Sequence, residues 1–427
     1  MINALEKKIR SKEAKIAVVG LGYVGLPLAV SFALKGFRVF GLDTDLDRVK
    51  KIKSQTSYIS DVKSDELARI VRNGLLSADT DFDIIKKSDV IIICVPTPLK
   101  SKYTPDISFI LKAVRAITKN LKANTLIVLE STTYPGTTEE IILPELEKSG
   151  LKVGRELFLS FSPERIDPGN KKYPVTKIPK VVGGTDEKSG YLTKLLYSQI
   201  IKEVLMVSTS RAAEMTKLLE NSFRIINIGW INEVAMMCNK LGIDIWEVIE
   251  AAKTKPFGFM PFYPGLGVGG HCIPDDPLYL YWKAKHHGFS SKFIKLSADI
   301  NSNMPKYIVG RIAGMIKSGG KVLVVGVTYK KDVKDLRKSP PLKLIELLQD
   351  NSFKVNYYDP LIPYLAINKI KMQAIKLNSK NVALYDCVVI ATDHTNVDYD
   401  LIKNSAKLVF DLRNVYKSTK TPKVVKL

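Results

Sequence analysis

A glycine-rich loop that carries a cysteine is the stretch whose residue types and spacing most directly suggest chemistry. It runs Pro264-Gly265-Leu266-Gly267-Val268-Gly269-Gly270-His271-Cys272-Ile273-Pro274-Asp275-Asp276-Pro277. Glycines let the backbone approach a ligand closely, and the Pro-Asp-Asp-Pro run after the cysteine predicts the start of a helix. Because a helix N-terminus favours a thiolate, Cys272 is a candidate nucleophile, with Asp276 as a base or orienting group. The alternative is a buried, unreactive cysteine.

Composition limits what the chain can be. Its 427 residues predict two or three domains, and 45% hydrophobic with 25% charged residues is typical of a soluble globular protein. No stretch of 18 or more apolar residues occurs, so we expect no membrane-spanning segment, and no signal-like run follows the N-terminal charges. The cysteines lack metal-like spacing, which suits a reducing cytoplasm, and the histidines form no recognisable metal site.

The net charge raises the question of a nucleic-acid partner. The chain has 65 Lys and Arg against 43 Asp and Glu, a formal charge of +22, and a basic nucleic-acid-binding surface is one interpretation. The lysines are dispersed along the chain, however, without a basic stripe interleaved with aromatic residues. We therefore expect a solvated lysine-rich surface and no nucleic-acid partner, with some preference for an anionic substrate.

The N-terminal region carries a dinucleotide fingerprint in its usual setting. A predicted strand, 15–19, is followed at once by Gly20-Leu21-Gly22-Tyr23-Val24-Gly25, a helix over 27–35, and a second strand that ends in Asp43. The glycines permit a tight turn that places a pyrophosphate on the helix N-terminus, and Asp43 can accept hydrogen bonds from a ribose diol. Because this carboxylate would repel a 2′-phosphate, we expect NAD rather than NADP. The alternative is a structural turn that binds nothing.

Polar residues follow three further predicted strands, 89–95, 125–130 and 157–162. They are Thr97, Thr132 and Glu164. In an open α/β sheet, ligands bind beyond the carboxyl ends of the strands. Each residue alone could be a capping residue in a loop, but three at corresponding places favour a site.

A long helix is expected from about Arg211 to Leu241, after a Ser-Thr-Ser capping cluster. Lys217 and Asn221 are four residues apart and share one face of it. A cation and an amide there could stabilise an oxyanion, although an exposed lysine beside an asparagine is the simpler interpretation. A helix of this length often bridges domains or subunits, and a second helical run, 245–253, precedes the cysteine loop.

The last third alternates strands and helices again, without a dinucleotide fingerprint. Strands are expected at 321–326, 354–358, 387–391 and 408–410, and basic residues follow some of them: Lys330, Arg337 and Arg413. These suggest phosphate binding or are ordinary surface charge. The expected fold is α/β, with two Rossmann-like doubly wound parallel-sheet domains joined by a long central helix and a helical middle domain. The expected boundaries are 1–205, 206–305 and 306–427.

Together these features resemble the UDP-glucose/GDP-mannose dehydrogenase family over nearly the whole chain. The motifs are Gly20 to Gly25, Val95-Pro96-Thr97-Pro98, Ser131-Thr132, Ser162-Pro163-Glu164, Lys217 with Asn221, Gly269-Gly270-His271-Cys272, and Tyr329-Lys330 through Arg337-Lys338-Ser339-Pro340. The resemblance implies an N-terminal domain that binds NAD, a C-terminal domain that binds UDP, and a homodimer built by the middle helix.

The resemblance also implies residue roles. Cys272 would be the nucleophile, Lys217 and Asn221 would stabilise oxyanions, and Asp276 would assist Lys217 or a water. Glu164 and Thr132 would serve hydrolysis through a bound water. The NAD-binding residues would be Gly20, Gly22, Tyr23, Val24, Gly25, Asp43, Thr97, Thr132 and Arg337. The UDP-sugar-binding residues would be Glu164, Arg165, Lys217, Asn221, Tyr263, Gly265, Gly267, Lys330 and Arg413. Asp275 stands where the family commonly has isoleucine, so which aspartate acts is open.

The implied reaction is the four-electron oxidation of a C6 alcohol to a carboxylate, with two NAD reduced and the aldehyde held on Cys272 as a thiohemiacetal and then a thioester. Two departures from the glucose-type enzymes, at 163–170 and 255–264, resemble the branch that oxidises UDP-N-acetylglucosamine or UDP-N-acetylgalactosamine. We expect UDP-N-acetylglucosamine, with UDP-N-acetylgalactosamine, UDP-N-acetylmannosamine and UDP-glucose as alternatives. A catalytically inactive sugar-nucleotide-binding protein is a rival hypothesis, against which the intact Cys272, Lys217, Asn221 and Asp276 argue.

Overall fold

The fold comes from a computed structural model, which describes residues 2–59, 61–101, 103–165, 177–367, 370–417 and 421–427. The chain divides into two compact units. The first consists of residues 1–220 with 282–288, and the second of residues 221–281 with 289–427. Among the described residues, no helix combines the length and the apolar character needed to cross a membrane.

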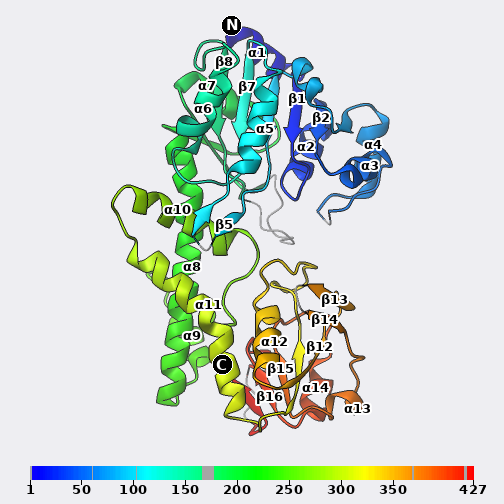
Figure 1. Cartoon of the computed structure of the whole chain (residues 1–427), viewed down its shortest axis with the longest axis vertical. Coiled ribbons are helices and arrows are strands. Elements are labelled where there is room, and N and C mark those ends of the chain that lie inside the picture. The colour runs from blue at the N-terminus through cyan, green and yellow to red at the C-terminus, as the bar shows by residue number, and fades with distance from the viewer. Residues whose placement is uncertain (1, 60, 102, 166–176, 368–369, 418–420) are drawn as a thin grey trace. The chain divides into compact units, whose positions relative to one another are not determined.

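An eight-stranded sheet with the order β10-β9-β8-β7-β4-β1-β2-β3 organises the first unit (Figure 1). Its strands are β1 (Lys15–Val19), β2 (Arg38–Leu42), β3 (Leu76–Asp79), β4 (Val90–Ile93), β7 (Thr125–Leu129), β8 (Leu157–Phe161), β9 (Lys180–Gly184) and β10 (Val204–Val207). The run from β3 to β8 has the order of the dinucleotide-binding fold. Strand β9 pairs antiparallel with β8, and β10 pairs parallel with β9, so two reversed strands extend the expected parallel sheet.

The central strands β1, β4, β7 and β8 are buried on both faces, which is why they read as nearly continuous apolar runs. Side chains alternate between faces along a strand: Ile16 and Val18 of β1 join one core cluster, whereas Ala17 and Val19 join the other. The packing elements are α1 (Ile2–Arg10), α2 (Gly25–Leu34), α3 (Leu46–Lys53), α4 (Ser64–Arg72), η1 (Phe82–Lys87), α5 (Ser108–Thr118), η2 (Thr138–Ile142), α6 (Leu143–Glu147) and α7 (Glu187–Tyr197), with a small hairpin of β5 (Leu99–Ser101) and β6 (Thr104–Pro105).

The helix α8 (Ser210–Leu241) is the long green helix of Figure 1, and the division between the units falls within it. The sequence predicted it to within one residue. The second unit also contains α9 (Ile245–Ala252), most of α10 (Cys272–His286) and α11 (Lys292–Ala313). The start predicted for α10, at the Pro-Asp-Asp-Pro run, is wrong, since the helix already begins at Cys272.

A parallel five-stranded sheet completes the second unit, in the order β12-β11-β15-β16-β17. Its strands are β11 (Lys321–Val325), β12 (Lys354–Tyr358), β15 (Cys387–Ile390), β16 (Val409–Asp411) and β17 (Val424–Lys426). The remaining elements are α12 (Pro340–Asp350), α13 (Ser379–Val382), α14 (Tyr399–Ser405) and the hairpin of β13 (Tyr364–Ile367) with β14 (Ile370–Gln373). Both sheets therefore have the α/β architecture expected.

The two sheets share one detail at the end of their first strands. Gly20 follows β1 with a φ of 93°, and the Oδ2 atom of Asp43 accepts the N–H of the next residue at 2.7 Å. Gly326 follows β11 with a φ of 81°, and Oδ2 of Asp359 accepts the N–H of the residue after it, also at 2.7 Å. The second sheet thus keeps the glycine and the acid of the fingerprint, although its sequence lacks the other glycines.

Candidate active site

The predicted site residues are divided between the two units. The first unit holds the fingerprint glycines with Tyr23, Val24, Asp43, Thr97, Thr132, Glu164, Arg165 and Lys217. The second unit holds Asn221, Tyr263, Gly265, Gly267, Cys272, Asp276, Lys330, Arg337 and Arg413. Lys217 and Asn221 are one turn apart on α8.

The glycine fingerprint forms a tight turn between β1 and α2. A Cβ atom on Gly25 would lie 1.8 Å from the carbonyl oxygen of Gly20, and one on Gly20 would lie 2.6 Å from that of Cys94. A Cβ atom on Gly22 would meet only the Arg48 guanidinium, at 3.9 Å, so space is open there. Helix α2 has no side-chain cap at its N-terminus and no acid in its first turn. An open turn before an uncapped helix fits the pyrophosphate of NAD.

Asp43 is fixed at the carboxyl end of β2. Its side chain is 7% exposed, and the carboxylate accepts the N–H groups of Leu21 and Asp45 at 2.7 and 2.9 Å and pairs with Arg48 at 3.2 Å. An acid at this place is the one that binds the ribose diol of NAD in dinucleotide-binding folds. Thr97 is buried in the loop after β4.

Lys217 is 7% exposed, and its ammonium donates to the carbonyl oxygen of Glu164, which follows β8. The interpretation of Lys217 as an exposed surface lysine is therefore wrong. Thr132 is half-buried after β7. Arg165 pairs with Glu220 of α8 at 2.6 Å and donates to the carbonyl oxygen of Pro179 at 2.7 Å. The predicted residues after β8 and those on the first turns of α8 thus lie together.

Cys272 is exposed and is the first residue of α10. By contrast, burial raises the pKa of Cys387 to about 12 and also raises the pKa of Cys94. The preceding residue, His271, has its pKa lowered by burial, so it is neutral at pH 7. An exposed thiol at a helix N-terminus has the accessibility and the dipole that a reactive cysteine needs.

The two aspartates after the cysteine have different partners. Asp276 is 1% exposed and accepts a hydrogen bond from the amide nitrogen of Asn221, with 2.6 Å between the atoms. Asp275 is also buried, and its Oδ1 atom pairs with Lys338. The geometry therefore joins Asp276, rather than Asp275, to the predicted residues of α8.

The glycine loop is anchored by two buried asparagines that the sequence analysis missed. The N–H of Gly265 donates to Asn232 of α8 at 2.8 Å, and Asn232 donates to Asn301 of α11 at 2.9 Å. Gly267 has a φ of 102°, and a Cβ atom there would lie 2.2 Å from the carbonyl oxygen of Asn301. Spacing could have indicated Asn232, because it lies three helical turns after Asn221 on the same face.

The end of the loop packs against the segment after β11. Cβ atoms on Gly269 and Gly270 would lie 2.6 and 2.9 Å from the Tyr329 side chain, and the N–H of Gly270 donates to the carbonyl oxygen of Arg337 at 2.9 Å. These contacts place Tyr329, the residue before Lys330, against the turn that leads into Cys272. The Arg337 side chain forms a bidentate pair with Asp335, with Nε to Oδ1 at 3.1 Å and Nη2 to Oδ2 at 2.6 Å.

Arg413 and Tyr263 have partners within the second unit. The Nε atom of Arg413 donates to the carbonyl oxygen of Ala391 at 2.9 Å, and its Nη1 atom lies 3.1 Å from where a Gly265 Cβ would be. The Tyr263 ring stacks on Trp246 of α9 with centroids 6.0 Å apart, and its hydroxyl donates to Glu250 at 2.9 Å. The glycine loop therefore lies beside an arginine, as a phosphate-binding loop would require.

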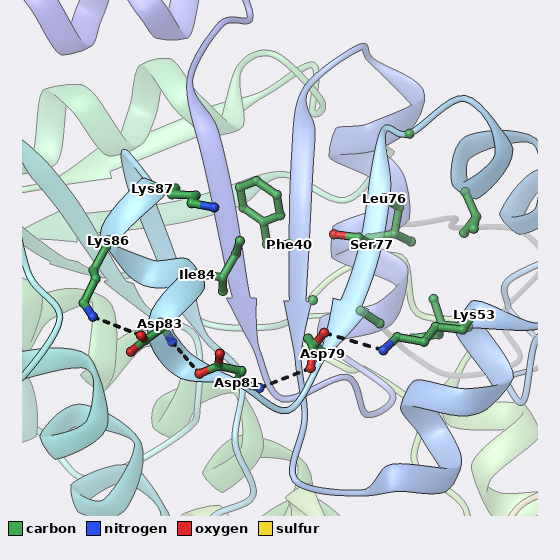
Figure 2. A pocket seen from close by; sticks show the side chains of 15 residues that line it. Phe40, Lys53, Leu76, Ser77, Asp79, Asp81, Asp83, Ile84, Lys86 and Lys87 are labelled. Atoms are coloured by element: carbon green, nitrogen blue, oxygen red, sulfur yellow. Dashed lines mark hydrogen bonds and ion pairs between the residues drawn. The ribbon is translucent and has the colours of Figure 1, made fainter.

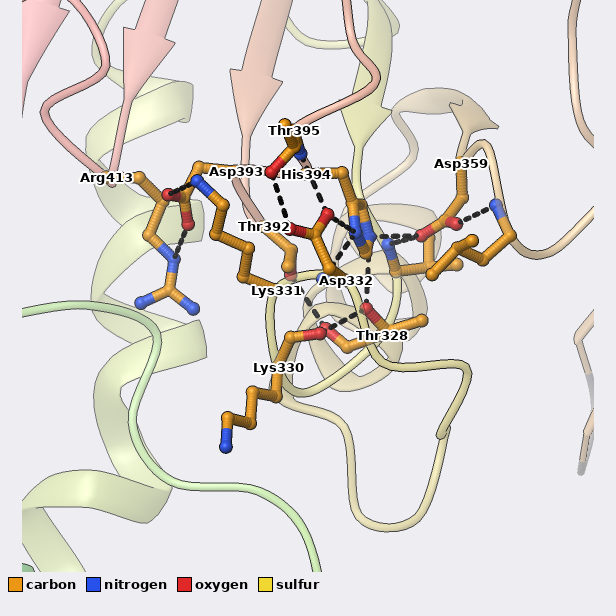
Figure 3. A network of polar contacts seen from close by, with 12 residues as sticks. Thr328, Lys330, Lys331, Asp332, Asp359, Thr392, Asp393, His394, Thr395 and Arg413 are labelled. Carbon is orange, nitrogen blue, oxygen red and sulfur yellow. Dashed lines mark hydrogen bonds and ion pairs between the residues drawn. The ribbon is translucent and has the colours of Figure 1, made fainter. Parts of the chain in front are cut away.

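A buried histidine holds the segment that carries Lys330 (Figure 3). His394 is 1% exposed, and its Nδ1 atom accepts the backbone N–H of Asp332 at 3.0 Å. Because Nδ1 accepts, Nε2 is the donor of this ring, and it lies 3.1 Å from both Asp359 and Thr328. The Thr328 hydroxyl donates to the carbonyl oxygen of Lys330 at 2.9 Å. The network joins the ends of β11, β12 and β15.

A pocket of about 630 Å³ in the first unit is lined by residues of β2, β3 and η1 (Figure 2). Phe40 and Ile84 are among its apolar lining residues, and Lys53 pairs with Asp79 in its lining at 3.5 Å. No predicted site residue lines it.

Comparison with known proteins identifies all three parts of the chain. Residues 14–201 match the NAD binding domain of the UDP-glucose/GDP-mannose dehydrogenase family, residues 211–303 its central domain, and residues 323–418 its UDP binding domain. The chain is 34% identical over 417 residues to the UDP-N-acetyl-D-mannosamine dehydrogenase of Pyrococcus horikoshii, covering 94% of this chain and 96% of that protein. It is 36% identical over 406 residues to the UDP-N-acetyl-D-glucosamine 6-dehydrogenase of Pseudomonas aeruginosa, covering 93% and 94%.

Solved structures agree with this relationship. The UDP-D-ManNAc dehydrogenase of Pyrococcus horikoshii superposes with a TM-score of 0.86 at 33% identity, covering 96% of this chain and 98% of that one. A UDP-glucose dehydrogenase of Pyrobaculum islandicum has a TM-score of 0.86 at 26% identity, covering 96% and 97%. The chain therefore belongs to the UDP-glucose/GDP-mannose dehydrogenase family, whose members are NAD-dependent oxidoreductases of nucleotide sugars.

Proposed function

We propose that this chain oxidises C6 of a UDP-N-acetylhexosamine to the carboxylate, with UDP-N-acetylglucosamine as the first candidate. The observation that carries the proposal is the exposed Cys272 at the start of α10, on a glycine loop one turn before the buried pair of Asp276 and Asn221. Relatives named for N-acetylglucosamine and for N-acetylmannosamine both support an N-acetylhexosamine. The run 255–264 supports it as well, whereas the run 163–170 lies beyond the described residues from 166 on.

NAD is bound, on this proposal, by the fingerprint turn, with Asp43 on the adenosine ribose. When bound, NAD supplies hydride acceptance, and two molecules account for the four electrons lost between alcohol and carboxylate. Because Asp43 is an anion, we expect faster turnover with NAD than with NADP at matched concentration. Equal rates with the two would contradict this placement of Asp43.

The chain's own residues do the remaining chemistry. The Cys272 thiolate adds to the C6 aldehyde, and Lys217 and Asn221 stabilise the negative charge that develops on oxygen. Asp276, fixed by Asn221, orients that amide or accepts a proton. The thioester formed by the second oxidation is then hydrolysed by a water that Thr132 and Glu164 hold. Each residue thus has a role that its chemistry permits.

The nucleotide is bound by the second sheet. We assign contacts with the diphosphate to Lys330 and Arg413. We assign positioning of the sugar nucleotide to Gly265, Gly267 and Tyr263. Arg165 is assigned to the sugar. Arg337 is assigned to NAD, for which it would have to leave Asp335. We retain the three-part division at 205/206 and 305/306, with a homodimer formed through α8.

A panel of UDP-sugars with NAD tests the proposal, with NADH followed by absorbance. UDP-N-acetylglucosamine should give the highest kcat/KM, followed by UDP-N-acetylgalactosamine. Highest turnover with UDP-N-acetylmannosamine or UDP-glucose would correct the sugar but keep the enzyme class. Binding of UDP-sugars without any NADH would instead support an inactive binding protein.

A further inference from the structure

Lys180, the first residue of β9, has a buried ammonium group that the proposed chemistry does not use. Its side chain is 6% exposed. The Nζ atom lies 2.6 Å from the Oε2 atom of Glu130, donates to the carbonyl oxygen of Pro163 at 3.1 Å, and lies 3.8 Å from the Oε2 atom of Glu164. One ammonium therefore contacts two carboxylates and the backbone just before the second of them.

Glu130 and Tyr197 complete the cluster behind Glu164. Glu130 is fully buried after β7 and accepts a hydrogen bond from the Tyr197 hydroxyl, and the Tyr197 ring centroid is 5.1 Å from the ammonium. Burial acts to lower the pKa of Lys180, but the charges of Glu130 and Glu164 outweigh it and raise this pKa. The ammonium thus keeps its charge throughout the neutral range.

The segment that presents Glu164 is held from two sides by lysines. Lys180 holds the carbonyl oxygen of Pro163, and Lys217 holds that of Glu164. The Oε1 atom of Glu164 accepts the N–H of Arg165 at 2.6 Å, which leaves Oε2 on the side of Lys180. A buried pair of Lys180 and Glu130 alone would contribute little net stability and would not link Lys180 to Glu164. A simple ion pair does not require the additional contacts of Lys180 to Pro163 and Glu164, and these contacts are the basis of the inference.

We propose that Lys180 is a positioning residue for the hydrolytic step, holding the Glu164 carboxylate and the backbone before it in place. The inference rests on the proposed function. In that step the oxygen of water bonds to the acyl carbon, one water proton passes to Glu164, and the C–S bond breaks with sulfur leaving as the Cys272 thiolate. The second proton is lost when the carboxylic acid ionises. Without the ammonium, the Glu164 carboxylate and the carbonyl of Pro163 lose the group that fixes them, and the thioester should persist.

The test is single-turnover kinetics with intact mass spectrometry of the covalent adduct. The main variant combines Lys180→Met with Glu130→Gln, so that no buried carboxylate is left unpaired. We expect normal NADH formation in the first turnover, accumulation of the thioester on Cys272, and hydrolysis slowed at least about tenfold. Lys180→Gln with Glu130→Gln, which keeps a donor to Pro163 but no charge, should also accumulate the thioester and serves if the first variant does not fold.

Glu130→Gln alone is the matched control, because it removes the ion pair and keeps the ammonium on Pro163 and Glu164. It should hydrolyse the thioester at close to the wild-type rate. Equal accumulation in this control and in the double variants would overturn the role of Lys180. Glu164→Gln separates the two proposals. If this variant accumulates the thioester but the double variants do not, the role of Lys180 is refuted and the hydrolytic role of Glu164 stands. If Glu164→Gln itself accumulates none, the proposed hydrolytic role of Glu164 fails.

Discussion

At the scale of single residues, what distinguishes Cys272 from the other cysteines is its position. It is exposed and begins a helix, whereas Cys238 and Cys387 are buried in cores and Cys94 is half-buried beside the fingerprint turn. Position at a helix N-terminus stabilises a thiolate, and exposure lets an aldehyde reach it. The chemical role of the thiol can be tested separately from its packing, because serine nearly matches cysteine in size.

Cys272→Ser should fold and bind both ligands but lose net turnover by a factor on the order of 10³ or more, because a serine alkoxide is far harder to form than a thiolate. The measurement is NADH formed per enzyme, with mass spectrometry for a sugar adduct. Cys94→Ser, Cys238→Ser and Cys387→Ser are the controls and should stay active. Turnover near wild type in Cys272→Ser would remove the thiol from the mechanism.

A second residue, Glu214 of α8, makes the stability of the first unit depend on pH. It is fully buried and accepts hydrogen bonds from the N–H groups of Gly136 and Thr138 and from the Thr138 hydroxyl. Burial outweighs these bonds and raises the pKa of Glu214 to about 7 from 4.5. Between the two values the folded chain holds more protons than the unfolded chain, so the free energy of unfolding falls as pH rises through this window.

Glu214→Gln should therefore flatten the pH dependence of thermal unfolding between about pH 4.5 and 7. Because one pKa unit corresponds to about 1.4 kcal/mol, the difference between wild type and variant should change by roughly 3 kcal/mol across the window, with the variant favoured at the upper end. Unfolding temperatures measured in steps of pH check this. Parallel curves for the two proteins would show that Glu214 titrates normally.

Candidate residues of the site could be predicted from the sequence where one short motif contains them. The glycine loop gave Cys272 and Asp276, but the pairing of Asp276 with Asn221 and of Asp275 with Lys338 joins residues more than 50 positions apart. No local pattern encodes which aspartate meets which partner. Lys180 was missed for the same reason, since it begins a strand with no motif of its own.

At the scale of elements, the proposed function depends on loops at the carboxyl ends of strands. The segment after β11 carries Tyr329 and Lys330 and is held by His394, which follows β15. In this network the Nδ1 atom of His394 acts as the hydrogen-bond acceptor and its Nε2 atom acts as the donor. Glutamine offers a donor and an acceptor as well, whereas alanine leaves the Asp359 carboxylate and the Asp332 N–H without this partner.

His394→Ala should raise the KM for the UDP-sugar about tenfold, the effect of losing buried hydrogen bonds that fix the loop, and leave the KM for NAD unchanged. His394→Gln should recover most of the loss, and Lys330→Ala should show the same selective effect as His394→Ala. Steady-state kinetics with each substrate varied in turn measures both constants. A larger change in the KM for NAD would place this network outside the nucleotide-sugar site.

The helix α8 shows what periodicity can and cannot predict. Its ends, and the shared face of Lys217 and Asn221, follow from spacing. Some of its large apolar residues are exposed, however: Trp230 is 52% and Leu241 71% exposed. Periodicity identifies a helix but not which element covers its apolar face, because that depends on tertiary or quaternary packing.

At the scale of the whole molecule, these exposed residues form a stripe. Phe223, Trp230, Met237 and Leu241 are seven, seven and four residues apart, so they lie on one side of α8. Exposed apolar stripes of this kind mark interaction surfaces. The stripe supports the proposed homodimer through α8.

Trp230→Glu should convert a dimer into a monomer in light scattering coupled to size exclusion, because it places a charge in an apolar contact. Asn239→Glu, which puts the same charge at an exposed position on the opposite side of α8, is the control and should leave the mass unchanged. A dimeric Trp230→Glu variant, or a monomeric wild type, would exclude this interface.

The overall architecture was predictable because strand and helix alternation encodes parallel sheets. The direction of β9 and β10 was not, since a short apolar strand has the same pattern whichever way it runs. The correspondence of Gly326 and Asp359 with Gly20 and Asp43 was also hidden, because only two of the fingerprint positions are kept. Long-range pairing, rather than local propensity, decides these features.

The central claim, a four-electron oxidation carried by one chain, is tested most directly by stoichiometry. The wild-type protein is incubated with excess NAD and a limiting amount of the best UDP-sugar of the panel, and NADH and sugar products are quantified together. The account predicts two NADH per UDP-sugar consumed, the uronic acid as the product, and no free aldehyde. One NADH per sugar with release of the C6 aldehyde would contradict it.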